Sequence, residues 1–393
     1  MDVDLPSSPG IGEARALFPH TAQGRVYLNH AGTSPLSSRV VEAMSAYLRQ
    51  RSEGALDTFQ TDLPMVADLR ARIQRMINAE SPERIAFTGN TSDAINIVAS
   101  GIRWKAGDRV LVNDLEFPAN VWPYANLRRL GVELDFLKCP DGRVSTDAVA
   151  GALTPRTRLV ALSAVQFLSG HRADLSAIGA ICRSRDVIFA VDGIQAAGAV
   201  RLDVQAMRMD ACAAGAQKWL MGPHGSGFLY VHEELQSRIT QSSLGWLGIA
   251  DPWDFFNYDQ PPAPSARRYE GGSMNMPSLW GMHASVATLE KTGSELVERR
   301  VLALSGLLID SLGAIDGVTI ITPPGLHERA GIVTASVGSP AEAKKVFKGL
   351  LERDVTIALR HGKLRYAPHF YNTQEEILKA VEATRECLAA LRR

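Results

Sequence analysis

The chain has 393 residues, of which 46% are hydrophobic and 21% charged, so it is long enough for two or three domains with a buried core. Its formal net charge is zero, which gives no support for a nucleic-acid partner or for an anionic membrane surface. No apolar run reaches membrane-spanning length and no basic, apolar leader pattern is present, so we expect a cytoplasmic protein. The four cysteines form no C-x-x-C pair, and we expect them to be reduced and mostly structural, with no metal site.

Near the N-terminus, residues 25–34 predict a short strand that breaks into a turn of small residues. Small residues let the backbone approach a ligand closely. His30 lies in this turn and is either a catalytic group or a hydrogen-bonding wall beside a substrate, and we favour the wall. Residues 36–50 and 63–79 are predicted to be helices. Apolar residues at helical spacing give the second helix an apolar face.

The next segment predicts a strand at Ile85–Thr88, a small polar turn, and a helix capped by Thr91 or Ser92. Hydroxyl groups and free N–H groups at a helix N-terminus form a natural seat for phosphate. A plain capped helix would show the same pattern. The glycine-lysine loop of nucleoside-triphosphate enzymes is not present.

Further buried strands are predicted at residues 108–112, 132–137 and 159–165. Phe117 lies between the end of the first of these strands and a helix that begins with proline. An aromatic ring in that place can stack on a flat ligand, although a phenylalanine in the core would give the same pattern.

Two segments in the middle of the chain carry the strongest indication of chemistry. The apolar run Asp186–Asp192 predicts a buried strand that ends on a carboxylate, and Met209–Gly215 predicts another buried strand followed by Lys218. Open α/β sheets bind ligands at the carboxyl ends of their strands. We therefore predict that Asp192 and Lys218 end neighbouring strands and face one cavity.

An aspartate and a lysine in this arrangement suit pyridoxal phosphate. This aldehyde forms a Schiff base with a lysine, and a buried carboxylate keeps its ring nitrogen protonated so that the ring can take up carbanion electrons. Lys218 is the candidate for the Schiff base and Asp192 for the partner of the ring nitrogen. The alternative is an unrelated strand-end aspartate and a surface lysine.

The pattern changes in the C-terminal part of the chain. A long helix is predicted from about residue 284 to 312, followed by mixed strands and helices that end in a helix at Gln374–Leu391. We predict a large cofactor-binding domain over residues 24–283 and a small domain over residues 284–393, with residues 1–23 packing on the small domain.

With these residues in place, the chain resembles the class V aminotransferase family of fold type I pyridoxal-phosphate enzymes. This group holds cysteine desulfurases, kynureninases and isopenicillin N epimerase-like proteins. The motifs that carry the resemblance follow one another as Tyr27-Leu-Asn-His-Ala-Gly, Asn90-Thr-Ser-Asp-Ala-Ile-Asn, Glu116-Phe-Pro-Ala-Asn, Asp192-Gly-Ile-Gln, Gln217-Lys-Trp, Glu270-Gly-Gly-Ser-Met-Asn and Leu364-Arg-Tyr-Ala-Pro-His-Phe-Tyr-Asn-Thr. The fold implied is α/β, with a mostly parallel seven-stranded sheet flanked by helices and a smaller α+β C-terminal domain.

The resemblance also implies roles around the cofactor phosphate. Thr91, Ser92 and Gln217 would bind the phosphate from within the same chain. Ser273 would reach the phosphate of the neighbouring subunit, which implies a homodimer.

Around the cofactor ring, the resemblance implies that Phe117 stacks on the ring, Asp192 pairs with the pyridine nitrogen and Gln195 pairs with the phenolic oxygen. On the substrate side, Arg365 would bind the α-carboxylate, a task suited to a planar guanidinium. Arg360 is a second candidate for this binding.

The chain departs from cysteine desulfurases at two places. Residues 357–365 are too few to form the loop that carries the desulfurase cysteine, and they contain no cysteine. Phe167 replaces the usual asparagine near the cofactor, as on the kynureninase and epimerase side of the family. Persulfide chemistry on a catalytic thiol is therefore not expected.

The predicted function is that of a pyridoxal-phosphate enzyme acting on an α-amino acid through an external aldimine and a quinonoid, with no membrane partner. Transamination or C–S cleavage without a catalytic cysteine ranks above epimerisation. The alternative from another class is a relative that binds the cofactor without turnover. A nicotinamide-dependent oxidoreductase is not supported, because no glycine fingerprint follows the first strand.

Overall fold

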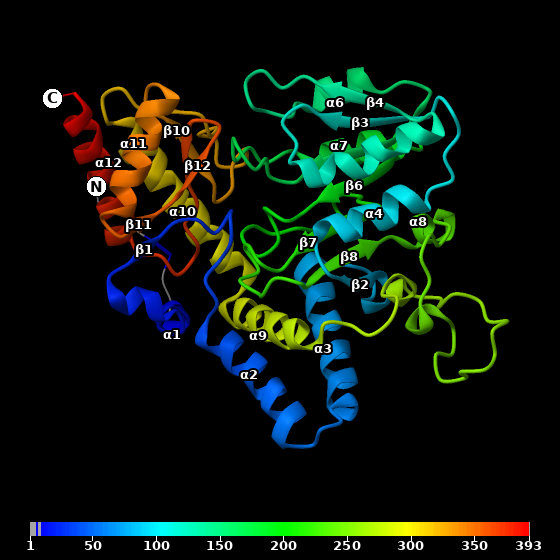
Figure 1. Ribbon diagram of the computed structural model, residues 1–393. Helices are drawn as coiled ribbons and strands as arrows, with labels where there is room; N and C mark the ends of the chain where they lie inside the picture. Colours follow the sequence, from blue (N-terminus) through cyan, green and yellow to red (C-terminus); the bar gives the residue numbers. More distant parts are fainter. Residues whose placement is uncertain (1–4, 7–8, 393) are drawn as a thin grey trace.

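A seven-stranded sheet forms the centre of the computed structural model, which describes residues 5–6 and 9–392 (Figure 1). Its strands are β2 (Ile85–Thr88), β3 (Arg109–Asn113), β4 (Glu133–Leu137), β5 (Thr157–Ser163), β6 (Ile188–Asp192), β7 (Ala211–Gly215) and β8 (Gly227–Val231). The strand order is β2-β8-β7-β6-β5-β3-β4, and β8 alone runs opposite to the other six strands. The predicted α/β class with a mostly parallel sheet is confirmed.

Both faces of this sheet are covered, which explains the continuous apolar runs of its strands. In β5, Leu159 and Ala161 pack into one hydrophobic cluster, while Val160 and Leu162 pack into another on the opposite face. The helices beside the sheet are α4 (Thr91–Gly101), α5 (Trp122–Ala125), α6 (Thr146–Ala152), α7 (Leu175–Ser184) and α8 (Glu233–Arg238). In the part of the chain that the structure describes, no helix is both long and apolar enough to span a membrane.

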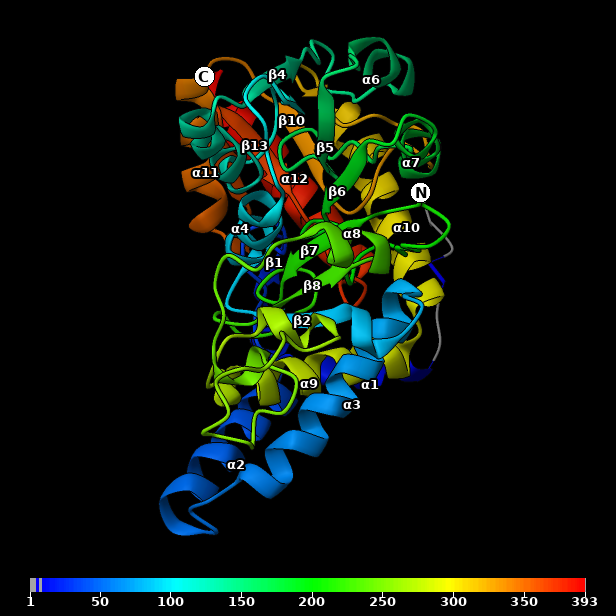
Figure 2. The ribbon, with the colours of Figure 1, turned by 90° about the vertical axis from the view of Figure 1, so that its right-hand side faces the viewer.

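The N-terminal segment consists of α1 (Pro9–Ala16), β1 (Val26–Tyr27), α2 (Ser38–Glu53) and α3 (Phe59–Ile77). β1 pairs with a strand near the C-terminus, and Phe18 stacks on Tyr371 with ring centroids 4.0 Å apart. The described residues before 24 therefore contact the C-terminal region. Helices α2 and α3 form a hairpin that projects from the body of the molecule (Figure 2).

The C-terminal part contains a second, four-stranded antiparallel sheet in the order β12-β13-β10-β9. Its elements are α9 (Met276–Thr292), α10 (Ser294–Gly313), β9 (Thr319–Ile320), β10 (Val333–Ser336), α11 (Pro340–Leu351), β11 (Val355–Thr356), β12 (Ala358–Arg360), β13 (Lys363–Tyr366) and α12 (Gln374–Leu391). β11 pairs in parallel with β1 instead. Strands and helices of this part form the predicted α+β arrangement.

The single helix predicted from residue 284 to 312 is wrong. Two helices, α9 and α10, meet at Gly293, whose φ of +90° is outside the helical range and favours glycine. Since α9 packs against α2 and α3 of the first part of the chain, the bend separates two packing environments. The proposed domain limits at residues 283 and 284 stay a prediction.

A close backbone contact holds the segment after β7 in place. Gly198 has a φ of +92°, and a Cβ atom there would clash with the backbone carbonyl of Trp219, lying 2.7 Å from its carbonyl carbon. A side chain at this position would push directly on the residue that follows Lys218.

We therefore predict that Gly198→Ala lowers the free energy of unfolding by about 3 kcal/mol, through backbone strain and overpacking together. Gly24 is the matched control, because its φ is +71° and no atom lies within 4 Å of the position that a Cβ atom would occupy. Gly24→Ala should cost about 1 kcal/mol, from strain alone. Denaturant titration of both apoproteins measures the difference, and equal losses would show that the contact with Trp219 is unimportant.

Candidate active site

Asp192 and Lys218 come together because β6 and β7 are parallel neighbours. Asp192 is the last residue of β6, and Lys218 follows the end of β7 in the turn beyond Gly215. The two side chains are 1% and 9% exposed. Burial lowers the pKa of Lys218, against the attraction of Asp192, and the charges of Arg365 and Arg360 lower it further. The amine is thus biased towards its free, nucleophilic form.

The carboxylate of Asp192 has one oxygen without a partner. Oδ1 accepts a hydrogen bond from the backbone N–H of Ile194 at 3.0 Å, whereas Oδ2 is buried and unpaired. Burial raises the pKa of Asp192, because a buried charge without a cation is unfavourable. A protonated pyridine nitrogen would supply both the missing donor and the missing positive charge, so this side chain fits pyridoxal phosphate.

The turn before α4 offers a second unpaired group. The predicted cap at Thr91 or Ser92 is wrong: Asn90 is the N-cap, and its Oδ1 accepts from the N–H of Asp93 at 3.0 Å. Asparagine competes well for this position because its side chain reaches the backbone. Because Asn90 caps the helix, the Thr91 hydroxyl is buried without a partner at the start of the helix. Ser92 is half-buried beside it. A phosphate at this helix N-terminus would satisfy the hydroxyl.

Phe117 presents its ring next to the lysine. The amine of Lys218 lies 5.3 Å from the centroid of the Phe117 ring, and the ring is 41% exposed, so part of its surface is free for a flat ligand. Phe167 packs edge-on against it with centroids 5.3 Å apart. Stacking of Phe117 on a cofactor ring stays a prediction that this placement supports.

Glu116 is a residue whose role sequence analysis missed. Its buried carboxylate accepts hydrogen bonds from the side chains of Asn113, Asn120 and Gln166, at 2.5, 3.2 and 3.2 Å. It also accepts from the backbone N–H and the hydroxyl of Ser163, at 2.7 and 2.5 Å. Burial raises the pKa of Glu116, and these donors oppose the rise.

This network connects the Phe117 turn to β5, because Glu116 binds Ser163 at the end of that strand. Ser163 in turn pairs with Asp192 at the end of β6. Gln166 keeps its amide oxygen buried and unpaired in the same region. Only the position of Glu116 directly before Phe117 hinted at such a role. Its partners come from separate segments, so the sequence did not reveal them.

Gln195 and Gln217 lie on either side of the lysine segment. The Gln195 carbonyl accepts from the indole N–H of Trp219 at 2.8 Å, and its amide donates to the carbonyl of Ala31 at 3.1 Å. Gln195 therefore braces the lysine segment in addition to its predicted role at the phenolic oxygen. Gln217 is half-buried, and its backbone carbonyl accepts from the N–H of Ser34 at 2.8 Å.

His30 is fully buried, and both of its ring nitrogens are used within the protein. Nδ1 lies 2.8 Å from the carbonyl of Ala367, and Nε2 lies 2.7 Å from the hydroxyl of Tyr371. Burial lowers the pKa of His30 well below its ordinary value. A neutral ring with no free nitrogen favours His30 as a hydrogen-bonding wall of the site and not as a catalytic group.

Arg365 is a buried guanidinium with unused hydrogen-bonding capacity. It is 2% exposed, Nη1 donates to the carbonyl of Phe167 at 2.7 Å, and Nε is buried without a partner. Burial and the charge of Arg360 lower the pKa of Arg365 to about 10. Within the described residues it forms no ion pair, which leaves it suited to a ligand carboxylate. Arg360 is exposed at the end of β12.

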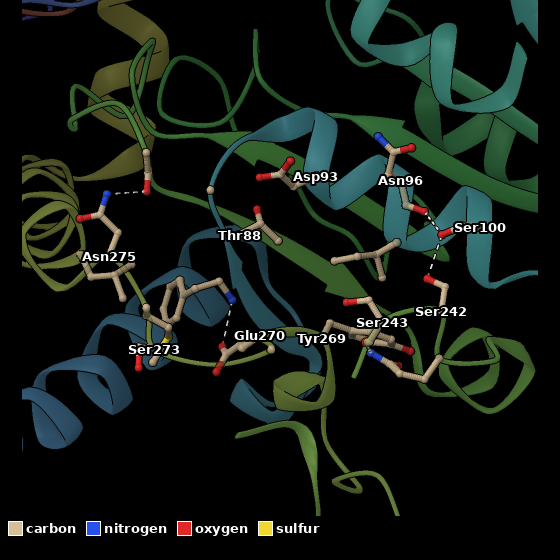
Figure 3. A pocket seen from close by; sticks show the side chains of 18 of the residues that line it. Thr88, Asp93, Asn96, Ser100, Ser242, Ser243, Tyr269, Glu270, Ser273 and Asn275 are labelled. Carbon is tan, nitrogen blue, oxygen red and sulfur yellow. Dashed lines mark hydrogen bonds between the residues drawn. The ribbon is translucent and has the colours of Figure 1, made fainter. Parts of the chain in front are cut away.

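Ser273 lies on the wall of a cavity of about 520 Å³, not beside Lys218 (Figure 3). Thr88 and Gly89, which lead into the Thr91 turn, line the same cavity. Figure 3 shows Ser273 across the cavity from Asn96 on α4. Ser273 is exposed, as a residue that acts on a second subunit would be.

Comparison with known proteins decides the family. The sequence model described as aminotransferase class-V matches residues 26–381. The chain belongs to the class V aminotransferase family. Among its relatives is a probable cysteine desulfurase of Methanothermobacter thermautotrophicus, 29% identical over 90% of this chain and 92% of the relative. Another is the uncharacterized aminotransferase YcbU of Bacillus subtilis, 27% identical over 94% of this chain and 95% of the relative.

Solved structures agree. A cystine C–S lyase, C-DES, in complex with its product cysteine persulfide has a TM-score of 0.86 and 26% identity, covering 94% of this chain and 99% of that one. The apo cysteine desulfurase of Thermococcus onnurineus has a TM-score of 0.87 and 25% identity, covering 99% of each chain. A C-DES variant carries glycine covalently linked to its pyridoxal-phosphate cofactor. This class V aminotransferase family member is a pyridoxal-phosphate-dependent enzyme, as predicted.

The lowered pKa of Lys218 leads to a prediction for apoprotein. Cofactor uptake requires the free amine, so its rate should rise with pH and level off at a pH below that of an ordinary lysine. Arg365→Gln removes a positive neighbour, so the pKa of Lys218 rises and the midpoint moves to higher pH. Absorbance after mixing apoprotein with pyridoxal phosphate gives the midpoint.

The control is Arg299→Ala, which removes a charge from an exposed site on α10 that does not act on Lys218. An identical midpoint in wild type and Arg365→Gln would show that this arginine has no electrostatic effect on the amine.

Proposed function

We propose that this enzyme is a C–S lyase, which cleaves the Cβ–S bond of a sulfur-containing α-amino acid without a thiol nucleophile of its own. The similarity to a cystine C–S lyase supports cleavage of such a bond. The absence of a thiol nucleophile rests on the burial and protonation of the four cysteines.

Thiolates, not thiols, are nucleophiles, and all four cysteines of this chain are buried. Burial raises the pKa of Cys139 to about 11 and that of Cys212 to about 12. The pKa values of Cys182 and Cys387 are raised by burial as well. Cys212 is nearest to the site, on β7 beside Asp192, whose negative charge further opposes ionisation. This arrangement supports chemistry that needs no protein-bound persulfide.

When bound, pyridoxal phosphate supplies a carbonyl for the substrate amine and an electron sink for a carbanion. Arg365 binds the α-carboxylate and orients the Cα–H bond. Lys218, biased towards its free form, takes the α-proton as general base. Asp192 would hold the proton on the ring nitrogen, and Phe117, packed against Phe167, would lie beside the ring.

The elimination balances without an added oxidant or reductant. The Cα–H electron pair forms a Cα–Cβ double bond while the Cβ–S pair leaves with sulfur, and the ammonium of Lys218 returns its proton to the departing thiolate. Hydrolysis of the released enamine gives a 2-oxo acid and ammonium. A disulfide substrate releases a persulfide in the same way.

A panel of amino acids tests the reaction. Cofactor-loaded protein should convert L-cystine or an S-substituted cysteine into pyruvate, ammonium and a sulfur product, measured by mass spectrometry. Lys218→Ala should reduce the rate by at least about a hundredfold, because the general base is lost. A 2-oxo acid formed only when a second 2-oxo acid accepts the amine would mean transamination. An inverted amino acid would mean epimerisation, and no turnover would mean a passive binder.

The absence of a catalytic thiol is tested separately. Each single Cys→Ala variant should retain C–S cleavage, and iodoacetamide should leave the native enzyme active, because the thiols are buried and protonated. One variant that folds, takes up cofactor and has no activity would identify a catalytic cysteine and refute this half of the proposal.

We also propose that the enzyme is a homodimer in which Ser273 reaches the phosphate of the neighbouring subunit. Exposed aromatic side chains lie in the loop before Ser273, at Trp246, Trp253, Phe255, Phe256 and Tyr258, and the first three contact one another. The N–H of Leu247 donates to the carbonyl of Gly271 at 3.0 Å, which joins this aromatic loop to the Ser273 segment. An exposed apolar patch of this kind is typical of a protein interface.

Mixed dimers test the cross-subunit role. Lys218→Ala and Ser273→Trp subunits are each inactive as homodimers, since one lacks the base and the other has a blocked phosphate contact. In a mixed dimer, one site would combine a native Lys218 with a native Ser273 from the other subunit. Activity should therefore reappear on mixing, at one site per mixed dimer. Mixed dimers can be isolated with two affinity tags. If they show no recovery of activity, Ser273 acts in the site of its own chain.

A further inference from the structure

Two arginines project from the same face of the hairpin formed by β12 and β13. The register pairs Ala358 with Arg365 and Arg360 with Lys363. Residues that pair directly in an antiparallel sheet share a face, and so do residues two apart on one strand. Arg360 is therefore a diagonal neighbour of Arg365, with the two Cβ atoms about 7–8 Å apart.

Both guanidinium groups act on the lysine that carries the chemistry. The charges of Arg365 and Arg360 each lower the pKa of Lys218, and Arg360 also lowers the pKa of Arg365. Among the described residues, neither arginine forms an ion pair with a carboxylate, although this chain pairs many of its other arginines. Two guanidinium groups without carboxylate partners therefore act on Lys218, one more than a single α-carboxylate neutralises.

The two arginines differ in depth. Arg365 is buried, whereas Arg360 is exposed, and its Nη1 donates only to the backbone carbonyl of Leu359 at 3.0 Å. One planar guanidinium already matches both oxygens of one carboxylate. The deep position suits the α-carboxylate next to the reacting carbon, and the outer position suits an anionic group further along the side chain.

We propose that the substrate carries a second carboxylate beyond its sulfur atom, and that Arg360 selects for it. This inference rests on the proposed C–S lyase function for the identity of the side chain. Arg360 is thus a specificity-determining residue and not a second contact to the α-carboxylate. Amino acids with neutral side chains of the same length enter the site but lack the outer ion pair.

Two substrates that differ only in charge provide the kinetic test. S-carboxymethyl-L-cysteine and S-carbamoylmethyl-L-cysteine have the same shape and the same leaving sulfur, but only the first carries a second carboxylate. Wild-type enzyme should favour the acid over the amide in kcat/KM by about tenfold at low salt, as expected for one charge-assisted contact. The preference should shrink as salt is added, because the outer site is exposed.

Arg360→Gln should lower this acid-to-amide ratio to about twofold or less, and Arg360→Lys should restore part of it, since a point charge remains. The ratio is the readout because the Arg360 charge also acts on Lys218 and changes both absolute rates. A wild-type ratio near one would overturn the proposal. A ratio that Arg360→Gln leaves unchanged would overturn it as well.

Equilibrium binding separates this inference from the proposed reaction. Adipate and its monoamide have no amino group and cannot react, so calorimetric titration of the cofactor-loaded enzyme measures recognition alone. Tighter binding of adipate that disappears in Arg360→Gln supports the second carboxylate site even if neither cysteine derivative is cleaved. Equal affinities for adipate and the monoamide refute the site even if C–S cleavage is observed.

Discussion

The burial of an aspartate and a lysine at one edge of the central sheet is the constraint on which the active site depends. Burial makes the charged form of each group costly, and one oxygen of Asp192 has no hydrogen-bond donor. Parallel pairing of β6 and β7 places them at one edge of the sheet, where each strand ends and the backbone turns away. Burial then lowers the pKa of the lysine and raises that of the aspartate, which prepares one for nucleophilic attack and the other for a cationic ring.

The lysine segment is held from several sides. Gln195 accepts from the indole of Trp219, and Gly198 lies directly against the Trp219 backbone. From the C-terminal part, the ring of His369 lies 2.9 Å from the carbonyl of Trp219. Burial lowers the pKa of His369 to about 4, so the ring is neutral and donates this hydrogen bond. The two parts of the chain thus meet at the reacting group.

Unpaired buried atoms are the clearest mark of what the site binds. Folded proteins rarely leave such atoms unsatisfied, because each one costs free energy. Here they include Oδ2 of Asp192, the hydroxyl of Thr91 and Nε of Arg365. The three require different ligand groups: a protonated nitrogen, a phosphate and a carboxylate. A pyridoxal-phosphate ring carrying an amino acid has all of them, which supports the roles proposed for these three residues.

Much of the fold followed from local pattern. The strand that ends on Asp192 and the C-terminal helix from Gln374 to Leu391 were predicted, because buried strands and amphipathic helices have distinct periods. The mostly parallel sheet was implied by the family resemblance. The order of the motifs pointed to the family and its cofactor. The helix predicted over residues 284–312 failed, because apolar periodicity continues across Gly293 although the backbone does not.

Only the tertiary structure decided how the polar groups share their hydrogen bonds. Asn90 is the helix cap that Thr91 or Ser92 was expected to be, and Glu116 accepts hydrogen bonds from segments distant in sequence. The hairpin register placed Arg360 beside Arg365. The sequence by itself determined which chemical groups are available and which cofactor they suit. Which of these groups remain free for a ligand depends on long-range contacts, and local sequence does not encode those.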